Sequence, residues 1–339
     1  MSQLFKKYPS LTNASQSKFI DNVKLFVQNQ LWVVTEKIHG ANFQVIFDKY
    51  GKMNFASRNQ FLGEFASFYD LPGLKETKYK EKTLVQRLTD LYDFLLLYYG
   101  NMLEKVNIYG EYAGTLTQGN SVQNEVQYGS QDFYIFDIMV TTNDNEFFLN
   151  KLVVRELCEI YNLAQPALLF VSPNFELALQ VPNDFDSISG DHRYSKEVYD
   201  KELTFTGKNI TEGVVIEPVE VQFYKDSRII IKNKNQKFSE NHSSKPMKKE
   251  SILSEDEQQF FDLIKGYSNT NRVSNICSHY GFSTREDIQK NFGLLVKETL
   301  QDAINDIKKD VDDIELLEKV IKLFSKSIAN SVREHLLSL

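Results

Sequence analysis

The chain has 339 residues, a formal net charge of −7 and an isoelectric point near 5.4. An acidic protein does not coat nucleic acid through its overall charge, although local basic surfaces can still bind it. The length exceeds what one hydrophobic core usually organises, so two domains are expected. The two cysteines, Cys158 and Cys277, are far apart and indicate neither a disulfide framework nor a zinc site.

The chain carries no sign of a membrane segment. Its N-terminus has no apolar signal core, and the longest apolar run, residues 94–99, is too short to cross a bilayer. We therefore expect an intracellular, soluble protein, either cytoplasmic or a viral protein in its host cell. We also expect a monomer without a membrane partner.

The first 240 residues have the pattern of an α+β domain with inserted helices. Leucines at helical spacing predict a helix that runs from Leu84 past Leu95 and stops at Gly100, and residues 152–161 predict a second amphipathic helix. The predicted strands are rich in β-branched and aromatic residues and end at Gly, Asn or Asp. They are residues 32–35, 42–47, 107–112, 133–140, 213–216 and 228–234.

Beyond the first domain, which we place at residues 1–240, the composition changes. Residues 241–251 are polar, basic and nearly devoid of apolar side chains, which predicts a linker. Residues 252–339 are helical in pattern and predict a small all-α domain. Candidate capping boxes and helix-ending glycines support this prediction. They are Ser254-x-x-Glu257, Ser283-x-x-Glu286, Gly266 and Gly281.

The stretch Glu36-Lys37-Ile38-His39-Gly40-Ala41-Asn42 puts a lysine in a tight turn between two predicted strands. With a reference pKa near 10.4, only about 0.1% of a free lysine is neutral and nucleophilic at pH 7.4. A catalytic site would have to lower that pKa by desolvation or by nearby positive charge. Taken alone, the stretch more often marks a solvated lysine beside a turn.

Lys232 and Lys234 project from one face of the predicted strand 228–234, and Ile229 and Ile231 project from the other. Paired lysines suit a polyphosphate and would also lower the pKa of a third lysine nearby, such as Lys37. The alternative is an exposed edge strand whose lysines deter aggregation.

For three further residues, the sequence allows both a role in ligand binding and a structural role. Glu111, between Gly110 and Gly114, suits a ribose hydroxyl or a structural salt bridge. Phe136 lies in an aromatic strand and suits either stacking on a purine or packing in the core. Glu212 precedes a strongly apolar strand, where a carboxylate needs either Mg²⁺ or a buried Arg or Lys partner.

Read in order, the motifs K-x-H-G-x-N, S-R, G-E-Y-A-G, D-F-Y-I-F-D-I, E-G-V-V-I and I-K-N-K resemble those of the nucleotidyltransferase superfamily of ligases and capping enzymes. DNA ligases and capping enzymes typically carry K-x-D-G, whereas E-K-I-H-G-A-N is similar to the RNA ligase 2 family, the phage-type ATP-dependent ligases of double-stranded RNA. Residues 269–275 and 292–294 are similar as well. The resemblance implies an adenylyltransferase domain with antiparallel sheets and a helical C-terminal domain that engages RNA.

The resemblance also implies sealing of 3′-OH/5′-phosphate nicks in duplex RNA, with ATP as the AMP donor. Lys37 would form the covalent lysine-AMP, and Glu212 would assist Mg²⁺ or Mn²⁺. Within the nucleotide site, Glu111 would bind the ribose and Phe136 would stack on adenine. The implied nucleotide-binding residues are Glu36, Ile38, His39, Asn42, Arg58, Glu111, Phe136, Lys232 and Lys234. The implied RNA-binding residues are Asn42, Arg58 and Arg272.

Some positions depart from the family pattern or match it weakly. Arg58 is followed by Asn-Gln-Phe, and Glu217 replaces a basic residue after the E-G strand, which could alter RNA affinity. Glu298 and Asp302 match two family acids, but the sequence favours solvated helix charges over a functional role for both. Residues 225–249 hold eight Lys or Arg against two acids, a basic stripe that suits RNA phosphates or a solvated linker. The rival interpretations of the whole are a DNA ligase, a guanylyltransferase and a non-catalytic duplex-RNA-binding protein.

Overall fold

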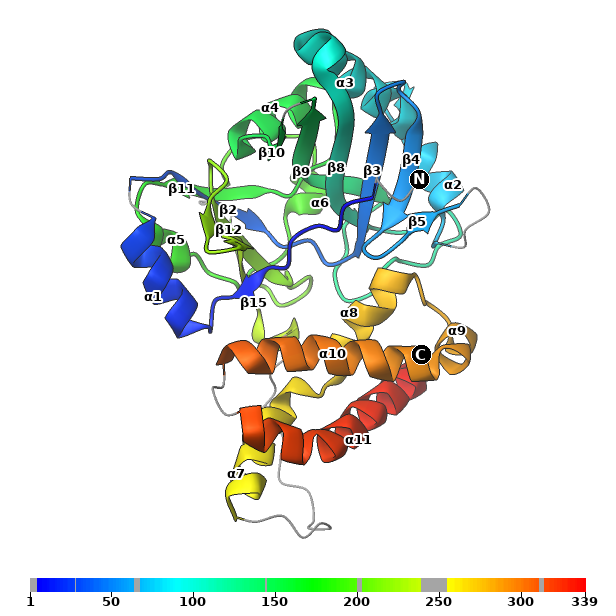
Figure 1. The fold of residues 1–339 in the computed structure, drawn as a ribbon. Helices are drawn as coiled ribbons and strands as arrows, with labels where there is room; N and C mark the ends of the chain where they lie inside the picture. Colours follow the sequence, from blue (N-terminus) through cyan, green and yellow to red (C-terminus); the bar gives the residue numbers. More distant parts are fainter. Residues whose placement is uncertain are drawn as a thin grey trace. The chain divides into compact units, whose positions relative to one another are not determined.

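The computed structural model describes residues 5–27, 29–63, 68–143, 145–199, 203–238, 255–310 and 314–339. The chain divides into two compact units, Met1–Asn235 and Gln236–Leu339, and each is described by itself. The first unit mixes antiparallel sheets with helices and the second is helical, which confirms the predicted α+β class (Figure 1). The predicted linker, residues 241–251, lies outside the described residues. None of the described helices is long and apolar enough to cross a membrane.

A six-stranded antiparallel sheet forms one layer of the first unit, in the order β10-β9-β8-β3-β4-β5. The predicted strands 42–47, 107–112 and 133–140 all lie within it. Its members are β3 (Ala41–Asp48), β4 (Met53–Ser57), β5 (Phe61–Leu62), β8 (Leu103–Ala113), β9 (Asp132–Thr142) and β10 (Glu146–Phe148). Alternate side chains of β3, from Ala41 to Phe47, are buried in one core, so the polar side chains between them face the other way.

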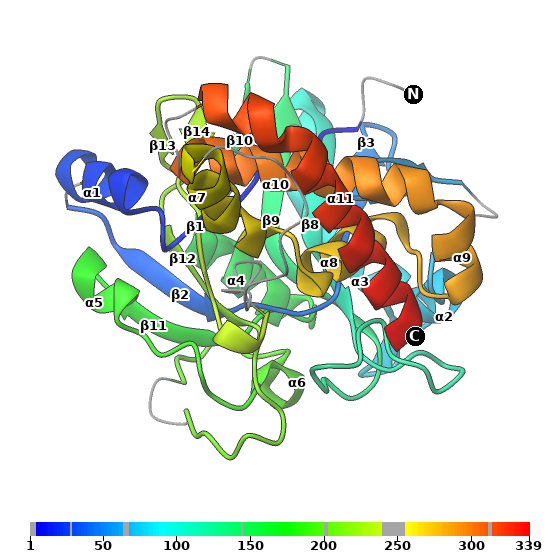
Figure 2. The same ribbon diagram turned by 90° about the horizontal axis from the view of Figure 1, so that it is seen from below.

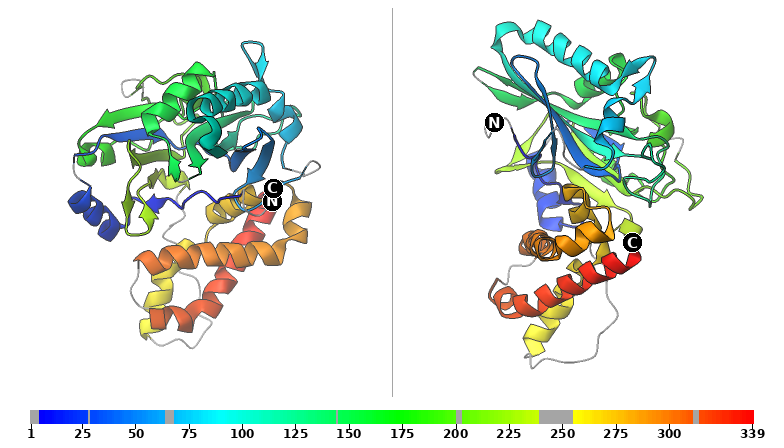
Figure 3. Two further views of the ribbon diagram at one scale, coloured as in Figure 1. Left: turned by 45° about the horizontal axis from the view of Figure 1, so that its top comes forward. Right: turned by 90° about the vertical axis from the view of Figure 1, so that its right-hand side faces the viewer.

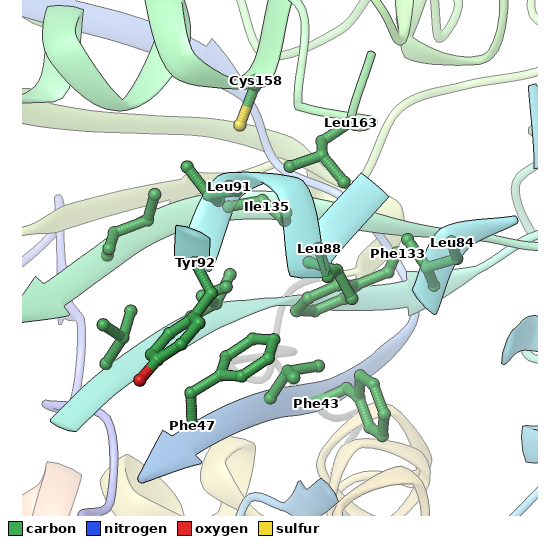
Figure 4. Packing of buried hydrophobic residues seen from close by; sticks show 14 of the residues in the cluster. Phe43, Phe47, Leu84, Leu88, Leu91, Tyr92, Phe133, Ile135, Cys158 and Leu163 are labelled. Atoms are coloured by element: carbon green, nitrogen blue, oxygen red, sulfur yellow. The ribbon is translucent and has the colours of Figure 1, made fainter. Parts of the chain in front are cut away.

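One face of this sheet is covered by α3 (Leu84–Tyr99), as Figures 1 and 3 show. A capping box between Thr83 and Gln86 begins the helix, and Gly100, with φ of 57°, ends it, as predicted. Figure 4 shows the side chains that join helix and sheet, among them Phe47, whose ring stacks on Tyr92 at a centroid distance of 4.7 Å. This core also includes α2 (Leu71–Lys75) and α4 (Lys151–Ile160), the second predicted helix.

A five-stranded sheet has the order β1-β15-β12-β2-β11. Only β1 and β15 are parallel to each other. The strands are β1 (Thr12–Asn13), β2 (Trp32–Glu36), β11 (Leu168–Ser172), β12 (Gly213–Pro218) and β15 (Ile231–Lys234). Residues of α1 (Ser17–Phe26) and α5 (Phe175–Leu179) pack in the core on one face of this sheet (Figure 2).

The prediction of one continuous strand over residues 228–234 is wrong. Residues Ser227–Arg228 form β14, a hairpin with β13 (Phe223–Tyr224), and β15 begins only at Ile231. The break arises because the amide of Ile230 donates to the carbonyl of Arg228, which turns the chain locally. The remaining short elements of this unit are β6 (Lys78–Tyr79), β7 (Lys82–Thr83), α6 (Ser189–His192) and η1 (Gly100–Met102).

The two sheets face each other through a small aromatic and aliphatic cluster. Tyr109 and Met139 come from the six-stranded sheet, Val215 comes from β12, and Tyr8 and Ile230 complete the contact. Side chains that point away from both large cores therefore meet between the sheets. The predicted site residues of the first unit occur on these sheets or in the turns next to their strands.

The second unit contains five α-helices among its described residues, and Figure 3 shows α10 and α11 as the longest. They are α7 (Glu255–Ile264), α8 (Thr270–Tyr280), α9 (Arg285–Lys290), α10 (Phe292–Asp310) and α11 (Ile314–Ser338), with 3₁₀ turns η2 (Gln236–Phe238) and η3 (Lys265–Tyr267). Gly281 ends α8 in the left-handed conformation, as predicted, and Gly266 lies in η3 just after α7 ends.

The predicted capping box at Ser283 is wrong by one residue. Thr284 caps α9 instead, because its hydroxyl accepts from the amide of Asp287 at 3.2 Å while the Asp287 carboxylate accepts from the amide of Thr284 at 3.1 Å. The other predicted box begins at Ser254, outside the described residues.

Candidate active site

Lys37 lies in the short turn that joins β2 to β3. Its backbone amide donates to the carbonyl of Gly213 at 2.8 Å, which extends the pairing of β2 with β12 by one residue. At Gly40, a Cβ atom would lie 2.3 Å from the carbonyl oxygen of Tyr112, so only glycine allows the turn to approach β8 this closely. The turn therefore has a fixed backbone, and the Lys37 side chain, 18% exposed, extends from it.

The buried carboxylate of Glu212 lies between two lysines. Lys37 Nζ is 2.7 Å from Oε2, and Lys234 Nζ is 3.0 Å from Oε1. Burial alone would raise the pKa of Glu212, but Lys37, Lys234 and His39 together hold this pKa well below its usual value. The structure thus brings Lys234 close to Lys37, as predicted, but through a carboxylate that both ammonium groups share. The structure also shows Glu212 in buried ion pairs with lysines, which was the alternative to a metal at this carboxylate.

His39 contacts a carboxylate at each ring nitrogen. Nδ1 is 3.3 Å from Oε2 of Glu212, and Nε2 is 3.0 Å from Oε2 of Glu125. Burial lowers the pKa of His39, but the hydrogen bonds to Glu125 and Glu212 outweigh it and raise this pKa above its usual value. The backbone amide of His39 donates to the hydroxyl of Tyr128 at 2.8 Å. His39 therefore links the Lys37 turn to the segment before β9.

Asn42 and Glu111 lie directly opposite each other in the pairing of β3 with β8. Their strand neighbours Phe43 and Tyr112 belong to the core beneath α3, so Asn42 and Glu111 occupy the other face of the sheet. Burial, assisted by the charge of Glu212, raises the pKa of Glu111 to about 7, while Lys37 and Arg58 oppose this shift. Glu111 thus belongs to the same electrostatic environment as Lys37 and Glu212.

Phe136 occupies a β-bulge in β9. The pairing with β8 passes from Asp137 opposite Tyr109 to Ile135 opposite Gly110, which leaves Phe136 as the extra residue. Ile135 and Ile138 point into the core beneath α3, whereas the Phe136 ring packs at 4.9 Å from the ring of Tyr8 in the cluster between the sheets. Phe136 therefore lies on the same face of the sheet as Glu111.

Glu36 and Ile38, the two neighbours of Lys37, are buried. One carboxylate oxygen of Glu36 accepts from the amides of Ile188 and Ser189 at 3.1 and 2.9 Å and from the Ser189 hydroxyl at 2.7 Å. The other oxygen accepts from the Thr211 hydroxyl at 3.2 Å. Both carboxylate oxygens of Glu36 therefore form hydrogen bonds within the protein. The predicted contact of Glu36 with a nucleotide stays a prediction.

Arg58 and Lys232 lie on opposite sheets of the first unit. Arg58 directly follows β4 and is close enough to Glu111 to lower its pKa against the effect of burial. Lys232 lies in β15 opposite Val215, two residues from Lys234 and so on the same strand face, with Ile231 in the core behind them. This face distribution of the two lysines agrees with the sequence prediction.

Arg272 lies in the second unit, where its guanidinium is buried. Its Nε donates to the carbonyl of Tyr267 at 3.0 Å, one terminal nitrogen pairs with Asp302, and the other lies 3.0 Å from Asp306. These contacts join α8 to α10. Asp302 was singled out from the sequence and Asp306 was not. The predicted contact of Arg272 with RNA stays a prediction.

Sequence reasoning missed Glu125, Tyr128 and Tyr8. Glu125 and Tyr128 lie in the irregular segment between β8 and β9, where neither periodicity nor a motif indicated a contact with His39. Tyr8 precedes the first strand and reaches Asp137 across 129 residues. Across the part of the chain that the structure describes, no group of three or more His, Cys, Asp or Glu side chains is arranged to hold a metal ion.

Two family models match the chain. The model for RNA ligase matches residues 30–234, which include every predicted nucleotide-binding residue, and the model for the T4 RNA ligase 2 C-terminal region matches residues 250–337. The first match covers both sheets that carry the site except β1, and the second covers most of the helical unit.

Solved structures of an RNA ligase from Naegleria gruberi are also similar. An apo mutant is 17% identical, with a TM-score of 0.48 over 70% of this chain and 58% of that chain. A mutant with ATP and Mn is 16% identical with a TM-score of 0.44, and the protein with PPi is 16% identical with a TM-score of 0.43, at the same coverage of 70% and 58%. The chain therefore spans less than two thirds of the length of the structures it matches.

Proposed function

Because this chain belongs to the RNA ligase family, we propose that it is an ATP-dependent ligase that seals 3′-OH/5′-phosphate nicks in duplex RNA. The observation that carries the proposal is the position of Lys37 Nζ, 2.7 Å from the buried carboxylate of Glu212, whose other oxygen binds Lys234. A lysine that can act as a nucleophile, next to a second lysine that can neutralise phosphate charge, suits transfer of a nucleotidyl group. The match of residues 250–337 to a T4 RNA ligase 2 region supports the duplex substrate.

In the first step, the neutral form of Lys37 attacks the α-phosphorus of ATP. An N–P bond forms, the amine nitrogen loses one proton to solvent, the bond from the α-phosphorus to the bridging oxygen breaks, and pyrophosphate leaves. Lys232 and Lys234 would neutralise charge on the α-phosphate, Glu111 would bind the ribose and Phe136 would stack on adenine. His39 lies beside Lys37 with both ring nitrogens bound to carboxylates, and it would act as pyrophosphate departs. Glu36 and Ile38 would flank the nucleotide.

In the second step, an oxygen of the RNA 5′-phosphate attacks the phosphorus of the lysine-AMP, which restores Lys37 and gives an AMP-RNA intermediate. In the third step, the neighbouring 3′-OH attacks that 5′-phosphate and displaces AMP. These displacements need positioning and charge neutralisation more than acid–base chemistry. Asn42, Arg58 and Arg272 would contribute to the RNA steps, with the basic stripe of residues 225–249 binding phosphates.

Mg²⁺ or Mn²⁺ would neutralise phosphate charge in these steps. Glu212 fits such an ion, because a carboxylate together with substrate phosphate oxygens is the donor set that Mg²⁺ uses. Both of its oxygens bind lysines in the structure. The AMP adduct would remove the positive charge of Lys37 and leave Oε2 of Glu212 able to act as a ligand. Glu212 would hold the metal, which would supply neutralisation of phosphate charge.

Sealing assays on nicked duplexes test this proposal. Four substrates, with RNA or DNA at the 3′-OH side and RNA or DNA at the 5′-phosphate side, are incubated with the protein, ATP and Mg²⁺. We expect joining of the all-RNA nick and transient AMP-RNA. Preferential joining of the all-DNA nick would favour a DNA ligase, and a covalent adduct formed from GTP but not ATP would favour a guanylyltransferase. Duplex binding without any adduct would favour a non-catalytic RNA-binding protein.

A further inference from the structure

Four charged side chains form a buried charge cluster beside Phe136. They are Asp137, Lys151, Glu217 and Arg228, each with a side chain no more than 7% exposed. Lys151 Nζ lies 3.1 Å from Asp137 and 2.9 Å from Glu217, and Arg228 lies 2.6 Å from Asp137 and 3.5 Å from Glu217. Two acids and two bases balance, which a buried set of charges requires.

Lys151 also contacts the backbone of β9. Its Nζ donates to the backbone carbonyl of Phe136 at 2.8 Å. Phe136 is the extra residue of the β9 bulge, so it stands outside the regular ladder with β8. The Lys151 ammonium therefore supplies a hydrogen bond to the backbone where the sheet is interrupted. Its two carboxylate partners hold the ammonium at that point.

The bulge matters because it places two successive side chains on one face. Ile135 and Ile138 both lie in the core beneath α3, so Phe136 and Asp137 between them both face the other side. Phe136 joins the cluster between the sheets, and Asp137 joins the buried charges. Without the bulge, strand alternation would put Asp137 in the apolar core.

Tyr8 fixes the ring of Phe136 from another direction. Its hydroxyl donates to Asp137 at 2.7 Å, and its ring lies 4.9 Å from the Phe136 ring. Burial raises the pKa of Tyr8 well above its usual value, so the hydroxyl remains a donor. The backbone of Phe136 is thus held through Lys151 and its ring is held through Tyr8, and both residues bind the same carboxylate.

We propose that Lys151 is a positioning residue for the nucleotide base, because it holds the bulge at which Phe136 presents its ring to a purine. The inference rests on the proposed function, in which Phe136 stacks on adenine. Lys151 would act on base recognition without touching the nucleotide. Its loss should therefore weaken binding of any ligand that contains adenine and leave binding of pyrophosphate unchanged.

The test compares Lys151→Met with Glu217→Gln in the full-length chain. Both substitutions disturb the buried charge cluster, but only Lys151→Met removes the bond to the Phe136 carbonyl. For Lys151→Met we expect KM for ATP in self-adenylylation to rise about tenfold and kcat to change by no more than about twofold. AMP should bind about tenfold more weakly in calorimetry, while the inhibition constant of pyrophosphate stays the same. Glu217→Gln should leave these constants within about twofold of wild type.

Two further variants test the role of Lys151 independently of a general loss of folding. Lys151→Arg retains a charged donor and should restore much of the affinity for AMP. If Lys151→Met does not fold, the double variant Lys151→Met with Glu217→Met removes one acid and one base together and preserves the balance of charge. It should fold and still bind AMP weakly.

The outcomes separate this inference from the proposed function. Equal affinities for AMP in wild type and Lys151→Met, or an equal loss for AMP and pyrophosphate, would overturn the positioning role alone. A wild-type protein that binds AMP neither free nor covalently would overturn the proposed function together with the inference.

Discussion

A buried carboxylate lies between two positively charged side chains at each end of β12, but the surroundings of the two carboxylates differ. Glu212, just before the strand, lies between Lys37 and Lys234, and Glu217, near its end, lies between Lys151 and Arg228. The Lys37 side chain is 18% exposed and that of Lys151 is 5% exposed. Lys151 also binds Asp137 and a backbone carbonyl. In the proposed function, the buried carboxylate at the Lys37 end of β12 serves the reaction, so we call this the reactive end. The carboxylate at the Lys151 end supports the fold, so we call this the architectural end.

Replacing Lys37 tests the reactive end and should have the largest effect. Lys37→Met should abolish transfer of AMP to the protein, a loss of at least about a thousandfold, because the proposed reaction uses the Lys37 amine as the nucleophile that forms the N–P bond. Its unfolding free energy should fall by only about 1 kcal/mol, since Glu212 keeps Lys234 and His39 as partners. Radiolabelled ATP and urea unfolding measure the two quantities. Adduct formation at the wild-type rate would contradict the role of Lys37.

The matched change at the other end of β12, Lys151→Met, should have a large effect on stability and a small effect on self-adenylylation at saturating ATP. Removing one base leaves two buried acids with one counterion, which should lower the unfolding free energy by roughly 3 kcal/mol. Self-adenylylation at saturating ATP should persist. Urea unfolding of both lysine variants in parallel gives the comparison directly. If Lys37→Met were the less stable of the two, the division between a reactive and an architectural end would be wrong.

Neutralising Glu212 should slow self-adenylylation although Lys37, the proposed nucleophile, remains in place. Glu212→Gln keeps the shape but withdraws the negative charge from Lys37, Lys234 and His39. We expect self-adenylylation to slow by about a hundredfold. Single-turnover kinetics with Glu212→Gln and Glu217→Gln side by side measure the contrast. Equal slowing of both variants would show that charge balance, not position, decides the effect.

Glu111 should make the stability of the folded protein depend on pH. Its pKa is raised to about 7 in the folded protein, chiefly by burial, so the unfolded chain ionises first as pH rises. The folded state therefore loses stability between roughly pH 4.5 and 7, by roughly 2 kcal/mol after allowance for its partial exposure to solvent. Glu111→Gln should be more stable than wild type at pH 8 and no different at pH 4. Urea unfolding at the two pH values checks this, and an equal difference at both would contradict it.

Glu125 should give the smallest effect. It contacts Nε2 of His39, and its side chain is 45% exposed. Glu125→Gln retains an oxygen that can accept from the ring, so self-adenylylation should change by about twofold to fivefold. The exchange of labelled pyrophosphate into ATP reports on this step. A loss as large as that of Glu212→Gln would place Glu125 among the essential acids.

The sequence predicted the elements on which the site lies because their patterns are local. Alternation along residues 42–47 and 107–112 fixed which side chains face the core, and this suffices to put Asn42 and Glu111 on the other face. The paired lysines of β15 followed from the same rule. Helix boundaries at Gly100 and Gly281 followed from the conformational freedom of glycine.

What escaped prediction depends on contacts between distant parts of the chain. The β9 bulge at Phe136 breaks the alternation, and no residue type marks it in advance. The partners of Lys151 are 14 and 66 residues away, and Glu125 is 86 residues from His39. The break between β14 and β15 coincides with the burial of Arg228 against Asp137, another contact that local pattern does not contain.

Peptide mapping by mass spectrometry after incubation with ATP and Mg²⁺ tests the central claim most directly. The account predicts AMP on the peptide that contains Lys37, its absence in Lys37→Met, and its transfer to the RNA 5′-phosphate when a nicked RNA duplex is added. AMP on a different residue, or no covalent AMP on the wild-type protein, would contradict it.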